Sequence, residues 1–191
     1  MNQIIQKAVE ILKNGGVIAF PTDTVYGIGC SIFNGNAIQR IYKIKGRDFN
    51  KPLPILLSKV EDINLYAQNI SDEAFDIINK YLPGPLTVIL EKSGLVSDMI
   101  TAGQMTVAIR VVDNPLVVKI ISLLGSPIVA TSANKSGSDD PLTSQDVIKS
   151  LGSDIDFVVD GGPCKIGTPS TIVDLTVRPF KVVRQGNLTL A

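Results

Sequence analysis

Basic side chains are concentrated between Phe20 and Lys51, where they follow a run rich in hydroxyl groups and glycine. The segment begins as an apolar stretch ends and continues through Pro21-Thr22-Asp23-Thr24. Hydroxyl groups and flexible backbone followed by concentrated positive charge suit an anionic ligand that bears phosphate. The segment ends in a basic cluster over residues 40–51, in which only Asp48 opposes the cations Arg40, Lys43, Lys45, Arg47 and Lys51.

Lys45 and Arg47 flank a glycine where a predicted helix ends. Cations at this position are favoured by the helix dipole alone, by ~0.3–1 kcal/mol. The fork-shaped guanidinium of Arg47 also suits bidentate contact with phosphate, and Lys45 would supply a point charge. Gly46 would let the backbone approach a ligand closely. A helix-end role and a phosphate-binding role therefore both remain open for this pair.

Polar residues also follow a predicted strand that ends near Ala130. Thr131-Ser132-Ala133-Asn134 either forms a turn held by its own side chains or faces a ligand. Ligands of α/β sheets collect just beyond strand ends, which favours the second interpretation. The glycine-containing stretch 161–163 and the hydroxyl-bearing stretch 167–171 also follow predicted strands or precede them, and they are interpreted in the same way.

Arg110 lies inside an alternating segment, Thr106–Val111. Its side chain is predicted to share a face with Ala108, opposite Val107 and Ile109. An arginine on a polar sheet face is often simply solvated, whereas one that faces a pocket is a receptor for a carboxylate.

The absence of histidine excludes several kinds of chemistry. A Ser-His-Asp triad, a Cys-His pair and an imidazole zinc site are impossible in this chain. Cys30 and Cys164 are far apart, lack metal-binding spacing and are expected to be reduced thiols. Catalysis must then use Lys, Arg, Asp, Glu, hydroxyls, backbone amides, or a metal that arrives with the substrate.

Length and composition indicate one globular domain. The chain has 191 residues, of which 45% are hydrophobic and 19% charged, enough for a substantial core. The formal net charge is zero, which argues against sequence-independent binding to a long nucleic acid. The first residues are too polar for a signal peptide, and no run of ~18 apolar residues exists. We expect a cytoplasmic protein with no membrane partner.

The periodicity of apolar residues predicts alternating helices and strands in the first part and neighbouring strands later. Because pure parallel winding needs a helix between each pair of strands, we expect a mixed, twisted α/β sheet with flanking helices. The stretch 132–141 is predicted to be a functional loop. Helices are predicted at 3–14, 36–45, 71–82, 115–124 and 143–151. Strands are predicted at 17–20, 53–57, 86–91, 106–111, 128–131, 157–160, 171–175 and 181–184.

The order of the short motifs is more specific than any motif alone. FPTDTVYGIG is followed by KGR, PGPLTVIL, TVAIR, IVATSAN, GGP, PSTIVD and VVRQG. In this order, over about residues 3 to 186, they closely resemble the YrdC/TsaC family, the threonylcarbamoyl-AMP synthases. The pairs KxR and SxN resemble that family's active-site motifs.

The resemblance implies an activity and a fold. Family members join L-threonine, bicarbonate and ATP, with Mg²⁺ accompanying the ATP, into L-threonylcarbamoyladenylate and release pyrophosphate. The product serves TsaD-type transferase machinery that modifies adenosine 37 in tRNAs reading ANN codons. The implied architecture is one twisted, open α/β domain over residues 1–191, with a large concave basic cavity.

The resemblance also implies roles for individual residues, and no protein-held metal is expected. The positions matching threonine-binding residues are Thr24, Arg110, Ala130 and Ser170. Those matching ATP-binding residues are Arg47, Lys51, Thr106, Ser132, Asp140 and Arg184. The catalytic set is Lys45, Arg47, Ser132 and Asn134, with proton relay by Asp23 or by Lys45 undecided.

Two departures from the family pattern bear on the site. Leu56 stands where some members have a histidine that helps to hold threonine, and Asp140 stands where others have a hydroxyl residue. The chain stops soon after VVRQG, as in the short, single-domain members. The alternatives are a double-stranded RNA or tRNA-binding module and an ATP-binding regulator without turnover. Zero net charge and 5% aromatic residues argue against the first.

Overall fold

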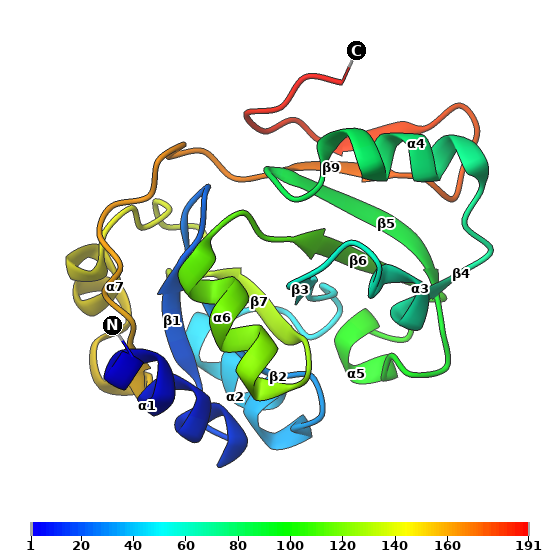
Figure 1. Ribbon diagram of the computed structural model, residues 1–191. Coiled ribbons are helices and arrows are strands. Elements are labelled where there is room, and N and C mark those ends of the chain that lie inside the picture. The colour runs from blue at the N-terminus through cyan, green and yellow to red at the C-terminus, as the bar shows by residue number, and fades with distance from the viewer. Residues whose placement is uncertain (1, 191) are drawn as a thin grey trace.

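One mixed sheet organises the protein in a computed structural model that describes residues 2–190 (Figure 1). Within this range its ten strands follow the order β10-β9-β5-β6-β3-β7-β2-β1-β8, and β4 pairs with β5. The pairs β1–β8, β3–β6 and β5–β9 are parallel and the others antiparallel, which confirms the expected mixed sheet. The strands are β1 (Ile18–Pro21), β2 (Tyr26–Ser31), β3 (Ile55–Leu57), β4 (Ala67–Gln68), β5 (Leu86–Lys92), β6 (Thr106–Val111), β7 (Ile128–Ser132), β8 (Phe157–Val158), β9 (Thr171–Asp174) and β10 (Lys181–Arg184).

Polar side chains cap four of the longer helices at their N-termini. Asn34, Ser71 and Asn114 each accept a hydrogen bond from a first-turn amide, and Thr143 forms a capping box with Asp146. The helices are α1 (Asn2–Lys13), α2 (Gly35–Lys45), α3 (Ile63–Tyr66), α4 (Asp72–Tyr81), α5 (Asp98–Thr101), α6 (Pro115–Leu124) and α7 (Ser144–Leu151), the last followed by a 3₁₀ turn at Gly152–Asp154.

The two faces of the sheet are covered unequally. On one face, α2, α3, α4, α5 and α7 contribute to a core that reaches from β1 to β9. On the other face, α1 and α6 lie side by side (Figure 1) and pack against β1 and β7, with Leu56 of β3 at the edge of this smaller core. The rest of that second face, toward β10, is left without a covering helix and forms the floor of the cavity described below.

Strand β2 is the main element that the sequence did not predict, because its two glycines read as a flexible turn. Gly29 instead lies at the centre of an antiparallel pair with β7. A side chain there would lie 2.5 Å from the carbonyl oxygen of Val129, so glycine allows the strands to approach. The short elements α3, β4 and α5 were also missed, while each predicted helix and strand is present with small shifts at its ends.

No helix among the described residues is long and apolar enough to cross a membrane.

Candidate functional site

A cavity of about 390 Å³ opens on the uncovered part of the sheet. Strand alternation decides which side chains form its floor: Thr87 and Ile89 of β5 and Ala108 and Arg110 of β6 face it, while Val88 lies in the main core. Four cations and one acid line it, so its charge is basic as the family resemblance implied. These five residues are Arg47, Lys51, Arg110, Arg184 and Asp140.

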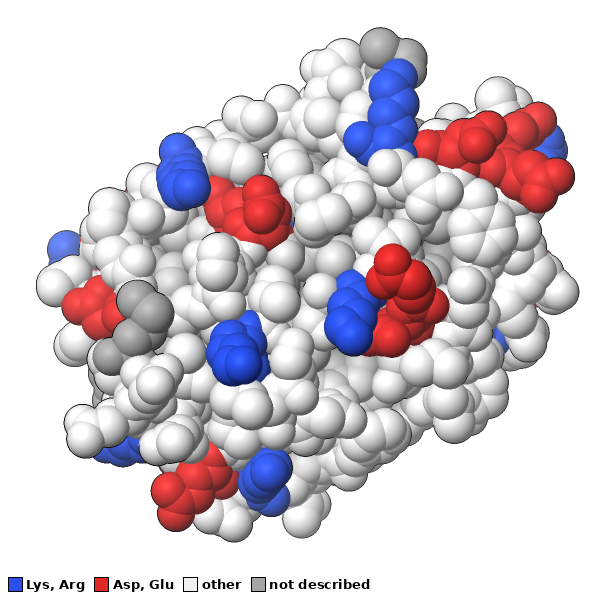
Figure 2. Space-filling view, viewed as in Figure 1, with Lys and Arg blue, Asp and Glu red and all other residues white. Residues whose placement is uncertain are grey.

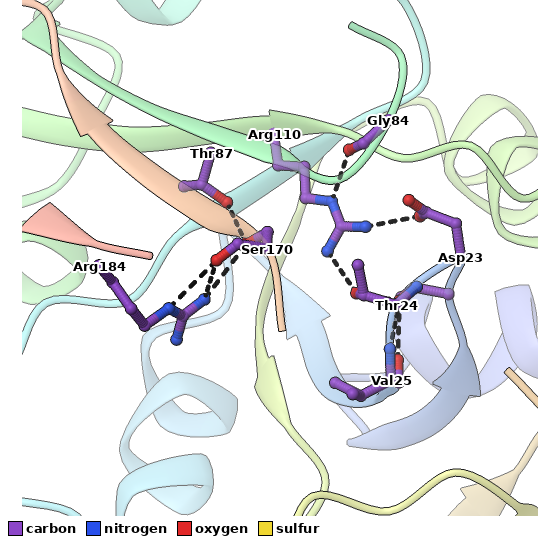
Figure 3. Close-up of polar contacts among 9 residues, drawn as sticks. Asp23, Thr24, Val25, Gly84, Thr87, Arg110, Ser170 and Arg184 are labelled. Carbon is purple, nitrogen blue, oxygen red and sulfur yellow. Dashed lines mark hydrogen bonds and ion pairs between the residues drawn. The ribbon is translucent and has the colours of Figure 1, made fainter. Parts of the chain in front are cut away.

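Arg110 lies on the floor and is held in one orientation by three hydrogen bonds (Figure 3). Its Nε donates to the Gly84 carbonyl at 3.0 Å, its Nη1 to Thr24 Oγ1 at 2.8 Å, and its Nη2 to Asp23 Oδ1 at 2.6 Å. Burial lowers the pKa of Arg110, and Asp23 opposes that shift. A guanidinium has five N–H groups, so two remain for a ligand. Charge-assisted donors of this kind suit a carboxylate.

Asp23 is the buried counter-ion of Arg110. Both side chains of this pair are less than 10% exposed. Asp23 Oδ2 is a buried acceptor that has no hydrogen-bond partner among residues 2–190. Asp23 does not line the cavity. Asp23 therefore holds Arg110 from outside the cavity lining. This position does not favour direct proton relay from a ligand.

Thr24 offers an acceptor to the cavity. Thr22 Oγ1 lies 2.7 Å from the carbonyl oxygen of Val25, so the Thr22 hydroxyl must donate there. Thr22 Oγ1 also accepts from the backbone N–H groups of Thr24 and Val25, at 3.1 and 3.2 Å, and it lies 2.9 Å from Thr24 Oγ1. Thr24 Oγ1 itself accepts one hydrogen bond, from Arg110, so it keeps a lone pair, which suits an N–H of a ligand.

Ser170 joins the Arg110 end of the cavity to Arg184. The Arg184 guanidinium donates from Nε and Nη2 to the Ser170 carbonyl at 3.1 and 2.8 Å, and from Nη2 to Ser170 Oγ at 3.2 Å. Ser170 Oγ also lies 2.8 Å from Thr87 Oγ1, as Figure 3 shows. The predicted site did not include Thr87. The signal that would have found it is a hydroxyl residue on the polar face of an alternating strand.

Arg47 lines the cavity from the loop that follows α2. Its Nη2 donates to the Pro52 carbonyl at 3.0 Å and its Nε to the Lys51 carbonyl at 3.4 Å. Burial lowers its pKa, with an opposing effect from Tyr42. Gly46 ends α2 in the left-handed conformation, with φ of 60°, so it serves as the helix cap. This differs from the expectation that Gly46 lets the backbone approach a ligand.

Lys45 lies beneath the 132–141 loop and does not line the cavity. Its Nζ donates to the carbonyl oxygens of Ser132 and Asn134 at 2.5 and 2.7 Å, and to Asn134 Oδ1 at 3.0 Å. These three acceptors match the three hydrogens of an ammonium group, and a contact of Lys45 with phosphate stays a prediction. The pKa of Lys45 is lowered to about 8, chiefly by burial and also by Arg47, while Asp140 opposes the shift.

Asn134 extends this contact into the loop. Its Nδ2 donates to the carbonyl oxygens of Ser138 and Asp139 at 2.6 and 3.1 Å and to Asp140 Oδ1 at 3.4 Å. Ser132 Oγ donates to Asn134 Oδ1 at 2.7 Å. Ser132 lines the cavity and Asn134 does not. The KxR and SxN motifs therefore meet in space, with Lys45 and Asn134 as the internal supports.

Three further positions complete the comparison with the predicted site. Ala130 and Leu56 both line the cavity, and Leu56 is paired with Arg110 in the β3–β6 register. Leu56 therefore places an apolar side chain on the strand next to Arg110. This is the position at which the family resemblance implies a histidine in some members. Thr106 lies on the same face of β6 as Arg110 but at the far end of the strand, outside the cavity lining.

No cluster of three or more acidic, histidine or cysteine side chains that could hold a metal occurs among the described residues.

Comparisons with known proteins agree with this geometry. Residues 10–186 match the Sua5/YciO/YrdC family model, whose description reads "Telomere recombination". The chain belongs to the Sua5/YciO/YrdC family. The matched range includes each predicted site residue, from Thr24 to Arg184.

Several members of the Sua5/YciO/YrdC family are similar in sequence. The threonylcarbamoyl-AMP synthase of Pyrococcus abyssi is 39% identical over 186 residues, which is 97% of this chain and 55% of that protein. The threonylcarbamoyl-AMP synthase of Vibrio vulnificus is 36% identical over 184 residues, 95% of this chain and 98% of that protein. The chain thus spans about half the length of some relatives and nearly all of others.

Solved structures of the Sua5/YciO/YrdC family share the fold. P. abyssi Sua5 complexed with L-threonine superposes with a TM-score of 0.93 at 38% identity, over 96% of this chain and 54% of that one. E. coli YciO gives a TM-score of 0.89 at 29% identity, over 98% of this chain and 91% of that one. The α/β fold predicted from the sequence is confirmed.

Proposed function

We propose that this protein is a threonylcarbamoyl-AMP synthase that forms L-threonylcarbamoyladenylate and pyrophosphate from L-threonine, bicarbonate or CO₂, and ATP. The observation that carries the proposal is one cavity with a carboxylate receptor, Arg110, on its floor and further cations around it. Support comes from relatives named for this activity and from the fold of Sua5 complexed with L-threonine.

The floor around Arg110 suits the amino acid. The two unused N–H groups of Arg110 would bind the threonine carboxylate, and the free lone pair of Thr24 would accept from its nitrogen. Ala130 and Leu56 provide apolar surface for the methyl group. This arrangement holds the nitrogen in place while it adds CO₂ to become a carbamate.

The remaining cations suit the triphosphate. Arg47, Lys51 and Arg184 would neutralise phosphate charge while the carbamate oxygen attacks the α-phosphorus in line and pyrophosphate leaves. Catalysis would consist mainly of positioning and charge stabilisation. Mg²⁺ would be held chiefly by the phosphates of ATP, because the described residues offer no acidic cluster. The ion would help to neutralise the charge of these phosphates.

The product would be consumed in the cytoplasm by a TsaD-type transferase that modifies adenosine 37 of tRNAs reading ANN codons. A mixed anhydride of this kind hydrolyses readily, so functional coupling to the consuming enzyme is chemically reasonable. RNA binding by this chain itself is not favoured. On the face in Figure 2, basic and acidic side chains are interspersed among neutral ones, and no broad basic area is present.

A pyrophosphate-release assay tests the proposed activity. Release from ATP should require both L-threonine and bicarbonate, with omission of either as the control. L-Serine should be a weaker substrate, because loss of one methyl group from an apolar contact costs ~1–3 kcal/mol. Equal turnover with threonine, serine and alanine would contradict the assignment of threonine.

A further inference from the structure

Thr87 is a threonine of the cavity floor that lies between Arg110 and Ser170. It is 3% exposed and faces the cavity from β5, while its neighbour Val88 faces the core. The pairing of Val88 with Ile109 places Thr87 beside Arg110 on the adjacent strand. Figure 3 shows its hydroxyl directed at that of Ser170.

Hydrogen-bond capacity restricts what Ser170 can offer to a ligand. A hydroxyl has one hydrogen and two lone pairs. Arg184 Nη2 donates to Ser170 Oγ and occupies one lone pair. If Thr87 also donates, both lone pairs are filled, and the Ser170 hydrogen is free to point into the cavity. If Ser170 donates to Thr87 instead, that hydrogen is not available to a ligand.

We propose that Thr87 is a positioning residue for the amino-acid substrate, and that it acts by donating to Ser170. The inference rests on the proposed function, in which the cavity binds L-threonine beside Arg110. A carboxylate accepts hydrogen bonds but cannot donate them, so its arrival selects the arrangement in which Thr87 donates and Ser170 points to the ligand. Two hydrogen bonds accepted by Ser170 also make its hydroxyl a stronger donor.

The test replaces the Thr87 hydroxyl with a methyl group of similar size. In Thr87→Val a methyl carbon would take the place of Thr87 Oγ1, which lies 2.8 Å from Ser170 Oγ. Ser170 would lose its hydrogen-bond partner, and it would also have to move away from the methyl group. The KM for L-threonine should rise about tenfold, equivalent to about 1.4 kcal/mol. The KM for ATP should stay within about twofold of wild type, because the Ser170 carbonyl still holds Arg184.

Conservative rescue and a matched control separate positioning from a general structural effect. Thr87→Ser keeps the hydroxyl and should restore the threonine KM. Thr101→Val makes the same change at another buried threonine, which lies in α5 outside the cavity lining and whose Oγ1 has no partner among residues 2–190. It should leave both KM values unchanged. An equal rise in Thr101→Val would overturn the inference.

The double variant Thr87→Val/Ser170→Ala tests whether Thr87 acts through Ser170. Its threonine KM should equal that of Ser170→Ala alone, because the contact no longer exists. Additive losses would overturn the inference. If Thr87→Val lost its thermal transition, Thr87→Ala would replace it, because alanine leaves space where valine clashes.

The assay distinguishes the inference from the proposed function. A wild-type protein without threonine-dependent pyrophosphate release would contradict the proposed function, and the inference with it. Normal wild-type activity with an unchanged threonine KM in Thr87→Val would contradict the inference alone.

Discussion

Arg47 is the cation whose removal should most clearly separate phosphate binding from a structural role. Arg47→Ala removes a charge-assisted donor from the cavity, so turnover should fall by ~10²-fold or more. Arg47→Lys should recover only part of it, because an ammonium cannot form the guanidinium fork. Pyrophosphate release measures both. Near wild-type activity of the alanine variant would remove Arg47 from the site. Loss of its thermal transition would favour a structural role through the Lys51 and Pro52 carbonyls.

The lowered pKa of Lys45 predicts a pH effect on ATP binding. Above a pH of about 8, the neutral amine has only two hydrogens for its three acceptors in the 132–141 loop. The base of the loop should loosen, and the Kd for ATP should rise between pH 7.5 and 9.5. Calorimetric titration without threonine or bicarbonate measures this directly. A Kd that is flat across the range would contradict the prediction.

The same pKa shift has a defined sign for stability. The folded-state pKa of Lys45, about 8, lies below the ordinary value of 10.5. The unfolded chain therefore binds more protons between these two values, and this group's contribution to the free energy of unfolding rises with pH across that window. Below pH 8 its unfavourable contribution is fully present. Binding and stability should thus respond to pH in opposite directions.

Sequence reasoning identified most of the cations and hydroxyls at the site but not their partners. Alternation along β6 placed Arg110 on the polar face, and the structure agrees. The contacts of Arg110 with Asp23, and of Thr87 with Ser170, depend on the pairing of distant segments, which one sequence does not contain. The contacts of Lys45 could not be predicted for a related reason, because the spacing of the KxR motif does not show that this side chain turns beneath the 132–141 loop.

The 132–141 loop is predicted to close over ATP. It begins at Ser132 on the cavity wall, and residues 135–139 are exposed. Closure would exclude water from the reactive adenylate. Hydrogen exchange across 132–141 should slow when ATP and threonine bind together, while the exposed turn at Gly94 and Leu95 serves as an unaffected reference. Unchanged exchange in 132–141 under turnover conditions would show that the loop is not a lid.

Elements with clear caps and long periodicity were predictable, whereas short or glycine-containing ones were not. The helix Pro115–Leu124 has both its proline start and its Gly125 end as expected. Strand β2 escaped prediction because Gly27 and Gly29 are usual in turns, and only the approach of β7 explains them. Helices α3 and α5 span four residues each, too few for a periodic signal.

The cavity draws on the whole molecule, from Thr22 to Arg184. Ligands that bind only the folded state should therefore stabilise the protein globally. ATP at ~100 times its Kd should add ~2.7 kcal/mol to the free energy of unfolding. For a chain of this length that corresponds to a rise of roughly 5–10 °C in Tm. Thermal scans with and without ATP measure it, and Arg47→Ala should show a smaller rise. An unchanged wild-type Tm at saturating ATP would contradict global coupling.

Strands β5 and β6 place core residues on one face and site residues on the other, and this division has a consequence for how the family can evolve. A substitution at Thr87 or Ala108 alters the site and leaves the core face of the same strand untouched. An insertion or deletion of one residue within either strand would instead exchange the two sets, moving Val88 or Ile109 into the cavity and polar groups into the core. Ligand preference in this scaffold can therefore drift through point mutations, whereas length changes must be confined to the loops.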